Sequence, residues 1–517
     1  MKKNYIYLFF ILFVTILQGC KDDSIVKGAE FSLSRDGQEV TDLSFGYGQG
    51  HIMVALASNT GWTLESDQAW CTLSNVSGKA TKEQYIKISY ERNTGEQSRK
   101  ATITMNAGGN IKQYAVTQGS KYDTIYPEGM EKDAIEVAKS IAIGWNLGNT
   151  LEAPDGEDTW GAPPTTQTII NKVKEMGFNA VRIPCAWNQP QYLEADGKTL
   201  KADWLNRVKE IVDLCLNADM YAIVNIHWDG GWQDQSCDAS ALTADSIATV
   251  EAKVYDFWTQ IATTFRDYDG RLLFAGANEP AVANREDMAV LRRYEQAFVN
   301  AVRNTGGNNT YRNLIVQGPD TNIDKTYDWF ELPEDPTPAR LMVEVHYYTP
   351  ANFCINDPTT DWCNSMTYFW GEQYKQYADE YMGGRFDTEQ QEGYVHDQMS
   401  KMKTKFVDQG IPVIIGEFGC NYRVLESENE DKLFKKLYSE SDYNKIIENR
   451  DMLQQKSEES EGYFLGYVAE QAKNYGCVPF LWDVQGARFF DRNTLDIVVP
   501  VIHQMLMEGA AKGHYPY

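Results

Sequence analysis

Two glutamates are placed where side chains can do chemistry, because each one follows a run of apolar residues. Glu279 comes after the run at 274–277, and Glu417 comes after the run at 413–415. A carboxylate at the end of a buried strand loses its hydration unless a partner pairs with it. Taken singly, each glutamate is explained equally well by a catalytic role or by a structural one, as a salt-bridge partner or a residue on the rim of the fold. Taken together, two carboxyl groups about 5 Å apart can cleave a glycosidic bond with retention, one attacking and the other protonating the leaving oxygen.

The segments that must position these glutamates are apolar runs of strand length that alternate with amphipathic helical patterns. This alternation begins at residue 134 and predicts parallel βα units. One helical pattern runs through Leu205, Val208, Ile211, Val212 and Cys215, and another through Met288, Leu291, Tyr294, Phe298 and Val302. The predicted strands are 141–149, 179–185, 221–227, 272–280, 313–318, 341–348, 412–419 and 477–484. Eight such strands predict an α/β fold, a (β/α)8 TIM barrel with long loops over 134–517.

Polar and aromatic residues gather at the carboxyl ends of these strands, where such a barrel builds its active site. The residues at or just beyond the predicted ends are Asn149, Arg182, His227, Trp228, Asn278, Glu279, His346, Tyr348, Glu417 and Trp482. The fifth strand, which ends near Gln317, offers the fewest polar or aromatic candidates. Because Glu279 ends strand four and Glu417 ends strand seven, we expect their carboxyl groups to face each other across the mouth of the barrel.

The surroundings of the two glutamates predict a division of roles. Arg182 and Tyr348 are expected near Glu417, where a cation and a hydroxyl donor would keep that carboxylate ionised as the nucleophile. Nearness of two carboxylates raises the pKa of one of them, which predicts that Glu279 stays protonated as the general acid.

Three further strand-end residues suit contact with the substrate or with the acid. Asn278 is placed to bond a sugar hydroxyl near the reacting centre, and such a bond strengthens as oxocarbenium character develops. His346 and His227 can either orient Glu279 or touch the sugar. For His227, a place in the core is an alternative explanation.

Tryptophans near the strand ends are candidates for sugar-stacking platforms. Trp482 offers a flat face to a pyranose ring, with barrel packing as the alternative. Trp228 stands in a glycine-containing segment after strand three and is expected to line a subsite. Four more are explained equally well as cleft or core residues: Trp160, Trp187, Trp362 and Trp370.

Residues 31–118 predict a separate domain made of short strands. Apolar and polar residues alternate at 51–56, 86–90 and 101–105, and Gly108-Gly109-Asn110 marks a hairpin turn. This pattern predicts a small, all-β, immunoglobulin-like sandwich, which a linker at 119–133 joins to the barrel. Trp62 and Trp70 are better explained by packing in its core than as sugar platforms.

Residues 1–20 predict a bacterial lipoprotein signal. A lysine pair precedes an apolar run at 5–17, which is short for a membrane span. The run ends in Leu-Gln-Gly before Cys20, the residue expected to be lipidated after cleavage; an ordinary signal peptide is the alternative. The acidic pair at 22–23 favours a place on the outer membrane facing the cell surface, with the periplasm as the alternative. No later segment is long and apolar enough to span a bilayer, so the lipid is the expected anchor.

Charge and cysteine usage narrow the partners and cofactors. The formal net charge of −25 at pH 7 repels polyanions, so no nucleic-acid partner is expected. Apart from Cys20, the eight cysteines have irregular spacing and no CxxC pair, which gives no support to a zinc or redox motif. Cys354 and Cys363 could form a disulfide, while most of the others are explained equally well as separate buried thiols.

Five strand-end motifs, in this order, resemble glycoside hydrolase family 5, the cellulase-type retaining barrels. The motifs are GWNLGNT at 144–150, VRIP at 181–184, NEP at 278–280, VHYY at 345–348 and IGEFG at 415–419. The resemblance covers about 134–513. The pattern of Trp62, Trp70-Cys71, 101–103 and 116–118 in the sandwich resembles the BACON module, which is commonly found ahead of carbohydrate-active enzymes.

The resemblance implies double displacement through a glycosyl-enzyme intermediate, with Glu279 as acid/base and Glu417 as nucleophile. It implies no metal and no organic cofactor, and it assigns a supporting role to Arg182, His227, Asn278, His346, Tyr348 and Trp482. The sequence departs from the family pattern at Trp228, where a second histidine is frequent, and at Ala281, where arginine is frequent. An acidic residue is also often found before the NEP motif, where this chain has 275–277 as AGA.

The expected substrate is a plant cell-wall polysaccharide. The leading hypothesis is an endo-β-1,4-glucanase that acts on cellulose-type, mixed-linkage or xyloglucan chains, because many aromatic residues suit an open cleft for a polymer. An endo-β-mannanase is an alternative, since its catalytic surroundings would look similar. A surface glycan-binding protein without activity is the alternative outside enzymes. We expect the protein to be a monomer.

Overall fold

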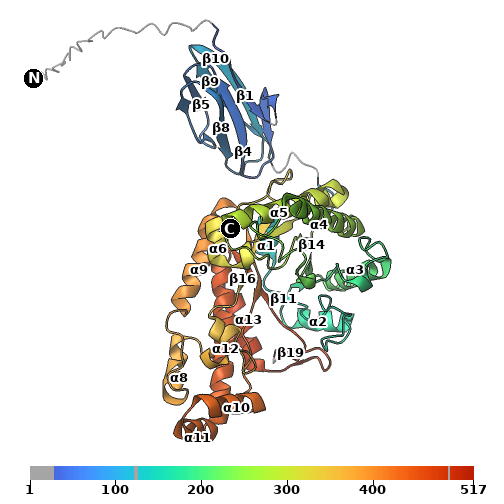
Figure 1. Ribbon diagram of the computed structural model, residues 1–517, viewed down its shortest axis with the longest axis vertical. Helices are drawn as coiled ribbons and strands as arrows, with labels where there is room; N and C mark the ends of the chain where they lie inside the picture. Colours follow the sequence, from blue (N-terminus) through green and yellow to red (C-terminus); the bar gives the residue numbers. More distant parts are fainter. Residues whose placement is uncertain (1–27, 36, 121–125, 487–488) are drawn as a thin grey trace, which may run out of the picture. The chain divides into compact units, whose positions relative to one another are not determined.

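The computed structural model describes residues 28–35, 37–120, 126–486 and 489–517, and Figure 1 shows the course of the chain. The chain divides into two compact units, Met1–Thr124 and Ile125–Tyr517. The predicted leader at 1–20 and its Cys20 lie outside the described residues. Within the described ranges, every helix is too short or too polar to span a bilayer.

The first unit is a β-sandwich of two five-stranded sheets, with strand orders β2-β1-β4-β8-β6 and β3-β10-β9-β5-β7. Strands β3 and β10 pair in parallel, and the other neighbours in these sheets pair antiparallel. The strands are β1 (Phe31–Arg35), β2 (Gln38–Glu39), β3 (Asp42–Phe45), β4 (Gly50–Ser58), β5 (Trp62–Ser66), β6 (Cys71–Leu73), β7 (Ser77–Gly78), β8 (Thr81–Tyr90), β9 (Arg99–Ala107) and β10 (Asn110–Gln118).

Side chains from both sheets fill one apolar core in the sandwich. Leu56 of β4 and Ile103 of β9 are fully buried there, one from each sheet. Trp62 and Trp70 are buried in the same cluster. The prediction that these two tryptophans pack in the core is therefore confirmed.

The predicted hairpin at 108–110 joins β9 to β10. Gly108 and Gly109 have φ angles of 58° and 79°, and Ala107 pairs directly with Asn110. A two-residue turn of this kind needs positive φ at both central positions, which glycine adopts without steric cost.

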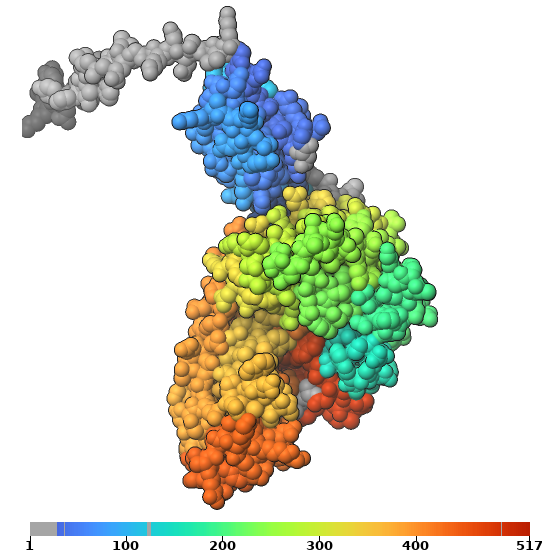
Figure 2. Space-filling model, viewed as in Figure 1, coloured from blue at the N-terminus to red at the C-terminus, as the bar shows by residue number. Residues whose placement is uncertain are grey.

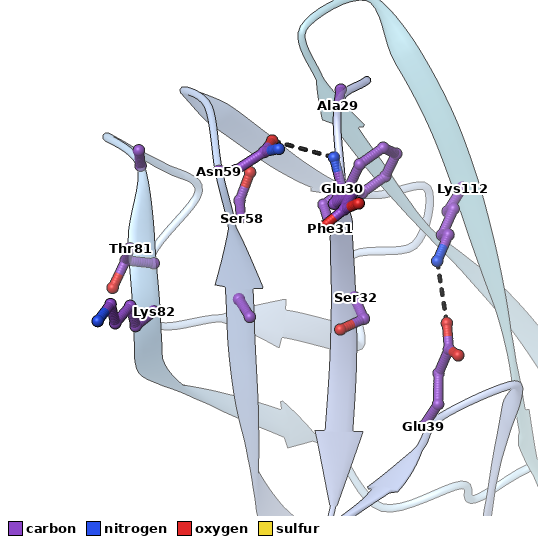
Figure 3. Close-up of a pocket in the computed structure, with 12 residues that line it drawn as sticks. Ala29, Glu30, Phe31, Ser32, Glu39, Ser58, Asn59, Thr81, Lys82 and Lys112 are labelled. Atoms are coloured by element: carbon purple, nitrogen blue, oxygen red, sulfur yellow. Dashed lines mark hydrogen bonds and ion pairs between the residues drawn. The ribbon is translucent and has the colours of Figure 1, made fainter.

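A hollow of about 760 Å³, lined by both polar and apolar residues, opens at one end of the strands β1, β4 and β8 of the sandwich (Figure 3). Lys112 donates to Glu39 Oε1 across 2.9 Å at its rim. The backbone N–H of Glu30 donates to Asn59 Oδ1 across 3.0 Å. Groups on this rim therefore bond to each other.

The second unit is a closed barrel of eight parallel strands in sequence order, as the alternating pattern predicts. The strands are β11 (Gly144–Asn146), β12 (Ala180–Ile183), β13 (Tyr221–Asn225), β14 (Leu272–Ala275), β15 (Leu314–Gln317), β16 (Leu341–Tyr347), β17 (Val413–Phe418) and β18 (Cys477–Leu481). Each strand lies inside its predicted range and ends earlier than predicted. Strand β14 stops at Ala275, so Glu279 stands on the segment beyond it.

Helices lie before, between and after the strands of this unit. They are α1 (Ala134–Ser140), α2 (Gln167–Glu175), α3 (Ala202–Asn217), α4 (Ala244–Thr264), α5 (Arg285–Asn304), α6 (Ile323–Trp329), α7 (Ala351–Cys354), α8 (Lys375–Tyr381), α9 (Glu392–Lys405), α10 (Glu428–Leu437), α11 (Glu440–Glu448), α12 (Arg450–Asn474) and α13 (Pro500–Lys512). The two helical patterns seen in the sequence are α3 and α5. A short hairpin, β19 (Phe490–Asp491) and β20 (Asp496–Ile497), precedes α13.

Helix α1 closes the amino end of the barrel. Its first turn is held by a capping box between Asp133 and Glu136. Val137 of this helix is fully buried in one cluster with Leu273 and Ile414, which come from early positions of β14 and β17. Apolar packing therefore occupies the amino end, and the carboxyl ends of the strands remain for function.

The long segments after β16 and β17 build a lobe with an apolar core of its own. Tyr368 and Met366 from the first segment pack there with Phe434 of α10. In Figure 2 a hollow opens between the yellow to orange segment that follows β16 and the teal segment that follows β11. Red residues of the C-terminal part of the chain line this hollow.

Two of the four additional tryptophans that we considered as cleft residues are core residues. Trp187 and Trp370 are fully buried. Their indole N–H groups donate to the backbone carbonyls of Asn225 and Gln390, so both rings are fixed in the interior. The cleft interpretation is wrong for these two, because the interior offers each ring apolar neighbours and its N–H an acceptor.

The described cysteines, from Cys71 to Cys477, are all free and buried thiols. The disulfide considered between Cys354 and Cys363 does not form. Cys354 packs in the main core of the barrel, whereas Cys363 packs in the core of the lobe. Nearness in the sequence does not bring these two side chains into one cluster.

Candidate active site

A fully buried guanidinium, that of Arg182 on β12, lies at the centre of the barrel mouth. Its Nη1 donates to Glu417 Oε1 at 2.9 Å and to Asn146 Oδ1 at 3.0 Å. Its Nη2 donates to Asn278 Oδ1 at 2.9 Å. Its Nε lies 3.0 Å from Glu344 Oε1. One side chain therefore joins groups from β11, β16, β17 and the segment after β14.

The two glutamates that the sequence singles out face each other at this mouth. One oxygen each of Glu279 and Glu417, with one nitrogen of His346, lie within 4.8 Å of one another. Retaining glycosidases hold their two carboxyl groups about 5–5.5 Å apart, whereas inverting enzymes need about 6.5–9.5 Å to admit a water. The observed separation fits retention.

The two carboxylates differ in their exposure. The side chain of Glu279 is 47% exposed, whereas that of Glu417 is 8% exposed. Tyr348 donates its hydroxyl to Glu417 Oε2 at 2.9 Å, which together with Arg182 gives Glu417 a charged partner and a neutral one. Glu417 is thereby held in one orientation, while Glu279 faces the solvent-filled cleft.

His346 lies between three carboxylates. Its Nδ1 is 2.7 Å from Glu279 Oε1 and 3.7 Å from Glu417 Oε2. Its Nε2 is 3.2 Å from Glu344 Oε1. Burial opposes the charge on the ring, but the charge of Glu417 and the bonds to Glu279 and Glu344 raise the pKa of His346 to about 10. His346 is therefore an imidazolium at neutral pH.

The expectation that nearness to Glu417 keeps Glu279 protonated is wrong for the free protein. Burial raises the pKa of Glu279. The hydrogen bond from His346 and the positive charge of the His346 ring have a larger effect in the opposite direction, and the pKa of Glu279 therefore lies below its ordinary value. The imidazolium of His346, which lies between the two carboxylates, decides the direction of the pKa shift of Glu279. The expectation from the sequence left the protonation of this ring out. In the free protein the proton lies on His346, 2.7 Å from Glu279.

His227 is neutral and its donor can be assigned. Burial, with the nearby charges of Arg182 and His346, holds the pKa of His227 well below its usual range. Asn225 Oδ1 accepts the backbone N–H of Cys185 at 3.2 Å, so its amide nitrogen faces His227 Nδ1 at 3.3 Å. Nδ1 is then the acceptor, and the ring proton lies on Nε2, which can donate to a sugar hydroxyl.

The indole of Trp482 stacks on the ring of His227. The two ring centroids are 5.8 Å apart and the planes differ by 6°. The backbone N–H of Trp482 donates to Phe418 O at 2.9 Å, which ties this residue to the end of β17. The structure thus brings Trp482 and His227 together beside the catalytic pair.

Trp228 follows His227 directly and is 48% exposed. The turn that carries it is held by buried Asp229, which accepts the Trp232 indole N–H at 2.8 Å and the Asn188 backbone N–H at 2.7 Å. An exposed ring on a fixed turn suits a sugar platform. Trp160 and Trp362 are also exposed, at 46% and 71%.

Asn149 occupies the loop after β11 with φ 56°. Its backbone N–H and that of Thr150 both donate to the carboxylate of Glu152. Arg492 bonds the carbonyl of Gly148 at 2.9 Å in the same loop. Asn149 therefore belongs to a loop at the mouth that several hydrogen bonds hold in place, and its own hydrogen bond runs from its backbone N–H to the Glu152 carboxylate.

Three buried polar residues of the site escaped the sequence argument: Glu344, Gln317 and Asn146. Glu344 could have been noticed, because it stands two positions before His346 on an otherwise apolar strand and so shares its face. Gln317 belongs to the strand end that was considered the poorest. It donates to Glu344 Oε2 at 2.7 Å and accepts the Ala277 N–H at 2.8 Å.

Asp234 also escaped notice, and it supports the segment that carries the acid. Its Oδ2 accepts the backbone N–H of Glu279 at 3.0 Å. Its backbone carbonyl accepts the N–H of Ala281 at 2.6 Å. Burial raises the pKa of Asp234 to about 7, against the lowering effect of the Glu279 N–H. The loop after β13 thus fixes the backbone on both sides of Pro280.

The grouping of Glu279, His346 and Glu417 has the spacing of a metal site as well as of a catalytic one. A histidine must be neutral to bind a metal ion. Because the pKa of His346 is raised to about 10, a proton occupies the nitrogen that a metal would need. The donor chemistry therefore favours an acid/base centre over a metal centre.

A closed parallel barrel with two carboxylates at this spacing defines a retaining glycoside hydrolase. Residues 142–486 match the family model described as Cellulase (glycosyl hydrolase family 5), and residues 32–121 match the one described as Viral BACON domain. The chain belongs to the cellulase family, glycosyl hydrolase family 5, and is an endo-β-1,4-glucanase in class.

Two proteins of similar sequence support this membership. The chain is 30% identical over 521 residues to the xyloglucan-specific endo-β-1,4-glucanase BoGH5A of Bacteroides ovatus, covering 95% of this chain and 93% of that protein. It is 32% identical over 403 residues to endoglucanase A of Paenibacillus barcinonensis, covering 73% of this chain and 90% of that protein.

Solved structures show the same fold. The Bacteroides ovatus xyloglucanase in complex with a XXXG heptasaccharide superposes with a TM-score of 0.65 at 28% identity, covering 93% of this chain and 100% of that one. XEG5B, a xyloglucan-specific β-1,4-glucanase from a ruminal metagenomic library in complex with XXLG, gives a TM-score of 0.63 at 36% identity, covering 75% and 98%.

The proton on His346 predicts a pH dependence of stability. The pKa is raised to about 10 in the folded protein from the ordinary value of 6.5. The stabilisation is therefore fully present below about pH 6.5 and is lost as the pH rises through about 10. In His346→Gln this loss should be absent, because glutamine takes up no proton.

Urea unfolding of both proteins between about pH 6 and about pH 10 measures the difference. His514→Gln, which changes an exposed histidine near the C-terminus, is the matched control and should follow the unchanged protein. Parallel curves for the unchanged protein and His346→Gln would contradict the assigned proton.

Proposed function

We propose that the protein hydrolyses internal β-1,4 bonds of xyloglucan by double displacement, with Glu417 as nucleophile and Glu279 as acid/base. The observation that carries the mechanism is the spacing of the two carboxylates, within 4.8 Å, with Arg182 and Tyr348 on Glu417 and His346 on Glu279. The unequal exposure of the two side chains supports the assignment of roles.

In the first step an oxygen of Glu417 attacks the anomeric carbon, and the bond to the leaving sugar breaks. The proton of the Glu279 carboxyl group goes to the leaving oxygen. A bound glucan covers the exposed side of Glu279 and adds to the desolvation that raises its pKa, so substrate binding itself favours the protonated acid. The imidazolium of His346 keeps its hydrogen bond to Oε1 and leaves Oε2 to carry the proton.

In the second step Glu279 takes a proton from water, and the water oxygen attacks the anomeric carbon. The bond to Glu417 breaks, and the carboxylate returns to its partners Arg182 and Tyr348. Each displacement inverts the carbon, so the β configuration is retained. The neutral His227, with its Nε2 proton, is placed to bond a sugar hydroxyl beside Trp482.

Two observations support xyloglucan as the substrate. The relative that matches along both domains is described as xyloglucan-specific, and two similar solved structures hold xyloglucan oligosaccharides. Exposed tryptophans also stand on three different loops at the carboxyl end, Trp160 after β11, Trp228 after β13 and Trp362 after β16. Such a spread of aromatic surfaces suits a wide, branched chain.

An unbranched glucan is the second candidate substrate. Similar solved structures at 25–29% identity are described as broad-specificity endoglucanases, from Clostridium longisporum and Ruminococcus champanellensis among others. An endo-β-mannanase and a glycan-binding protein without activity are the other outcomes that the following experiments separate.

Glu417→Ala should lower kcat by about 10^4-fold or more while substrate binding persists, because the covalent step loses its nucleophile. Glu428→Ala, which removes an exposed glutamate of α10, is the matched control and should keep the unchanged rate. Added azide should rescue Glu417→Ala as the α-glycosyl azide. With an aryl glycoside it should rescue Glu279→Ala as the β-glycosyl azide. Surviving hydrolysis in Glu417→Ala, or the opposite azide products, would overturn the assigned roles.

A panel of purified polysaccharides decides the substrate. We expect the highest kcat/KM on xyloglucan, with oligosaccharide products that keep their xylose branches. Equal rates on carboxymethyl cellulose and mixed-linkage glucan would indicate broad specificity. Release of manno-oligosaccharides at the highest rate would replace the glucanase assignment by a mannanase.

We further propose that the protein is an outer-membrane lipoprotein anchored through Cys20 and exposed on the cell surface. The charged start, the apolar run at 5–17 and the sequence Leu-Gln-Gly-Cys support this proposal. Cells that express the unchanged protein should incorporate labelled fatty acid into it, and Cys20→Ser should abolish the label. Ser24→Ala is the matched control and should keep it.

Protease treatment of intact cells then separates the cell surface from the periplasm. Loss of the unchanged protein from intact cells supports surface exposure. Protection until the outer membrane is opened supports the periplasm. Label that persists in Cys20→Ser would refute the anchor.

A further inference from the structure

A third carboxylate, that of Glu344 on β16, lies beneath the catalytic pair and is fully buried. Its Oε1 is 3.0 Å from Arg182 Nε and 3.2 Å from His346 Nε2, so this one oxygen meets both cations of the site. Its Oε2 accepts a hydrogen bond from Gln317 Nε2 at 2.7 Å. Arg182 and the hydrogen bond from His346 hold the pKa of Glu344 below its usual range against the effect of burial.

The barrel leaves space for this carboxylate. A Cβ atom at Gly416 would overlap Glu344 Oε1, so the residue directly before the nucleophile has to be glycine. Gln317, which holds the other oxygen, is itself fixed by the Ala277 N–H at 2.8 Å. Groups from β12, β15, β16 and β17 therefore define the place of the Glu344 carboxylate.

The charges around the pair can be counted from these contacts. Arg182 and His346 are two cations, and Glu344 is one anion that does not face the cleft. One positive charge is left over. It is balanced when Glu279 and Glu417 together carry one negative charge and one proton, which is the state that the acid step requires.

We propose that Glu344 is a positioning residue that sets the net charge of the active site, so that the catalytic pair carries one negative charge at each stage of the reaction. This inference rests on the proposed roles of Glu279 and Glu417. In the first step Glu279 gives its proton to the leaving oxygen while Glu417 becomes a neutral ester. In the second step Glu279 regains a proton from water while Glu417 is released as the anion. The charge of the buried cluster is the same before and after each step.

Other ionisable groups besides Glu344 also face the catalytic pair, Glu279 and Glu417. These are Arg182 on β12, His227 after β13, Asp234 on the following loop, His346 and Tyr348 on and after β16, and the pair itself. His227 is neutral, and burial holds the pKa of Tyr348 well above its usual range. Asp234 is the same in all the variants proposed below, so comparison between them isolates Glu344.

The experiment is the pH profile of kcat for Glu344→Gln on the preferred glucan, because kcat reports the ionisation of Glu279 in the complex with substrate. Without the buried anion the site has an additional positive charge, which favours the ionised form of Glu279. The limb on the basic side should therefore move to lower pH by about one unit or more, with kcat reduced and KM close to that of the unchanged protein. A readout of proton affinity of this kind does not respond to a loss of packing alone.

The matched control is Glu461→Gln on α12. Glu461 is fully buried like Glu344, but it accepts the backbone N–H of Arg423 at 2.8 Å and forms no ion pair with Arg182 or His346. Its replacement removes no carboxylate that contacts these two cations and should leave the basic limb where it lies in the unchanged protein. Gln317→Leu is a second test that leaves every ionisable group of the site in place. It removes the donor to Glu344 Oε2 but keeps the anion and its two cations, so it should move the basic limb much less than Glu344→Gln does.

A measurement without substrate keeps the inference separate from the proposed function. The ring nitrogens of His346, assigned by their absence in His346→Gln, should titrate by NMR at a lower pH in Glu344→Gln than in the unchanged protein. Unmoved His346 titration and an unmoved basic limb in Glu344→Gln, or equal shifts in Glu344→Gln and Gln317→Leu, would overturn the inference. An active Glu417→Ala would instead overturn the proposed function, whatever Glu344→Gln does.

Discussion

The interaction on which the site depends is the burial of one guanidinium. A cation without contact to solvent is costly unless several good partners replace its hydration. Arg182 has four such partners, Asn146, Asn278, Glu344 and Glu417, each within 3.0 Å. These partners come from four different parts of the barrel. The guanidinium of Arg182 can meet all four of them only if the barrel strands keep their register. Loss of any one partner would leave buried charge or a buried donor unpaired, which explains why the catalytic carboxylate is also a structural group.

The protons of the site follow from this arrangement. Two carboxylates near each other would by themselves raise the pKa of one of them. In this protein the imidazolium of His346 lies between them and lowers the pKa of Glu279 in the free state, whereas the charge of the fully buried Glu344 acts in the opposite direction. Substrate then has a second role beside occupying the cleft, because covering the exposed side of Glu279 favours the protonated acid. Binding and acid catalysis are linked through desolvation of the same side chain.

The exposed tryptophans that we propose to bind the substrate lie outside the barrel strands. The loops after β11, β13 and β16 carry exposed tryptophans, and the lobe built by the segments after β16 and β17 has an apolar core of its own. A lobe with its own core can hold such loops in place around the mouth without disturbing the strands. Of the catalytic pair, Glu417 stands on β17 itself and Glu279 on the short segment after β14, where the barrel fixes both. The catalytic groups and the residues that we propose to bind the substrate therefore lie in different parts of the same domain.

The amino-acid sequence by itself determined the alternation of strands and helices, the place of each barrel strand, the sandwich, and the residues Glu279, Glu417, Arg182, His346 and Tyr348 at the strand ends. These features depend on local periodicity and on the general rule that barrels use the carboxyl ends of their strands. Only the tertiary structure decided that Trp187 and Trp370 are core residues, that Cys354 and Cys363 belong to different cores, and that Gln317 and Glu344 support the site. It also decided the sign of the pKa shift of Glu279. The physical reason is that burial, pairing and protonation depend on distances between side chains far apart in the sequence, and a local pattern contains no information about those distances.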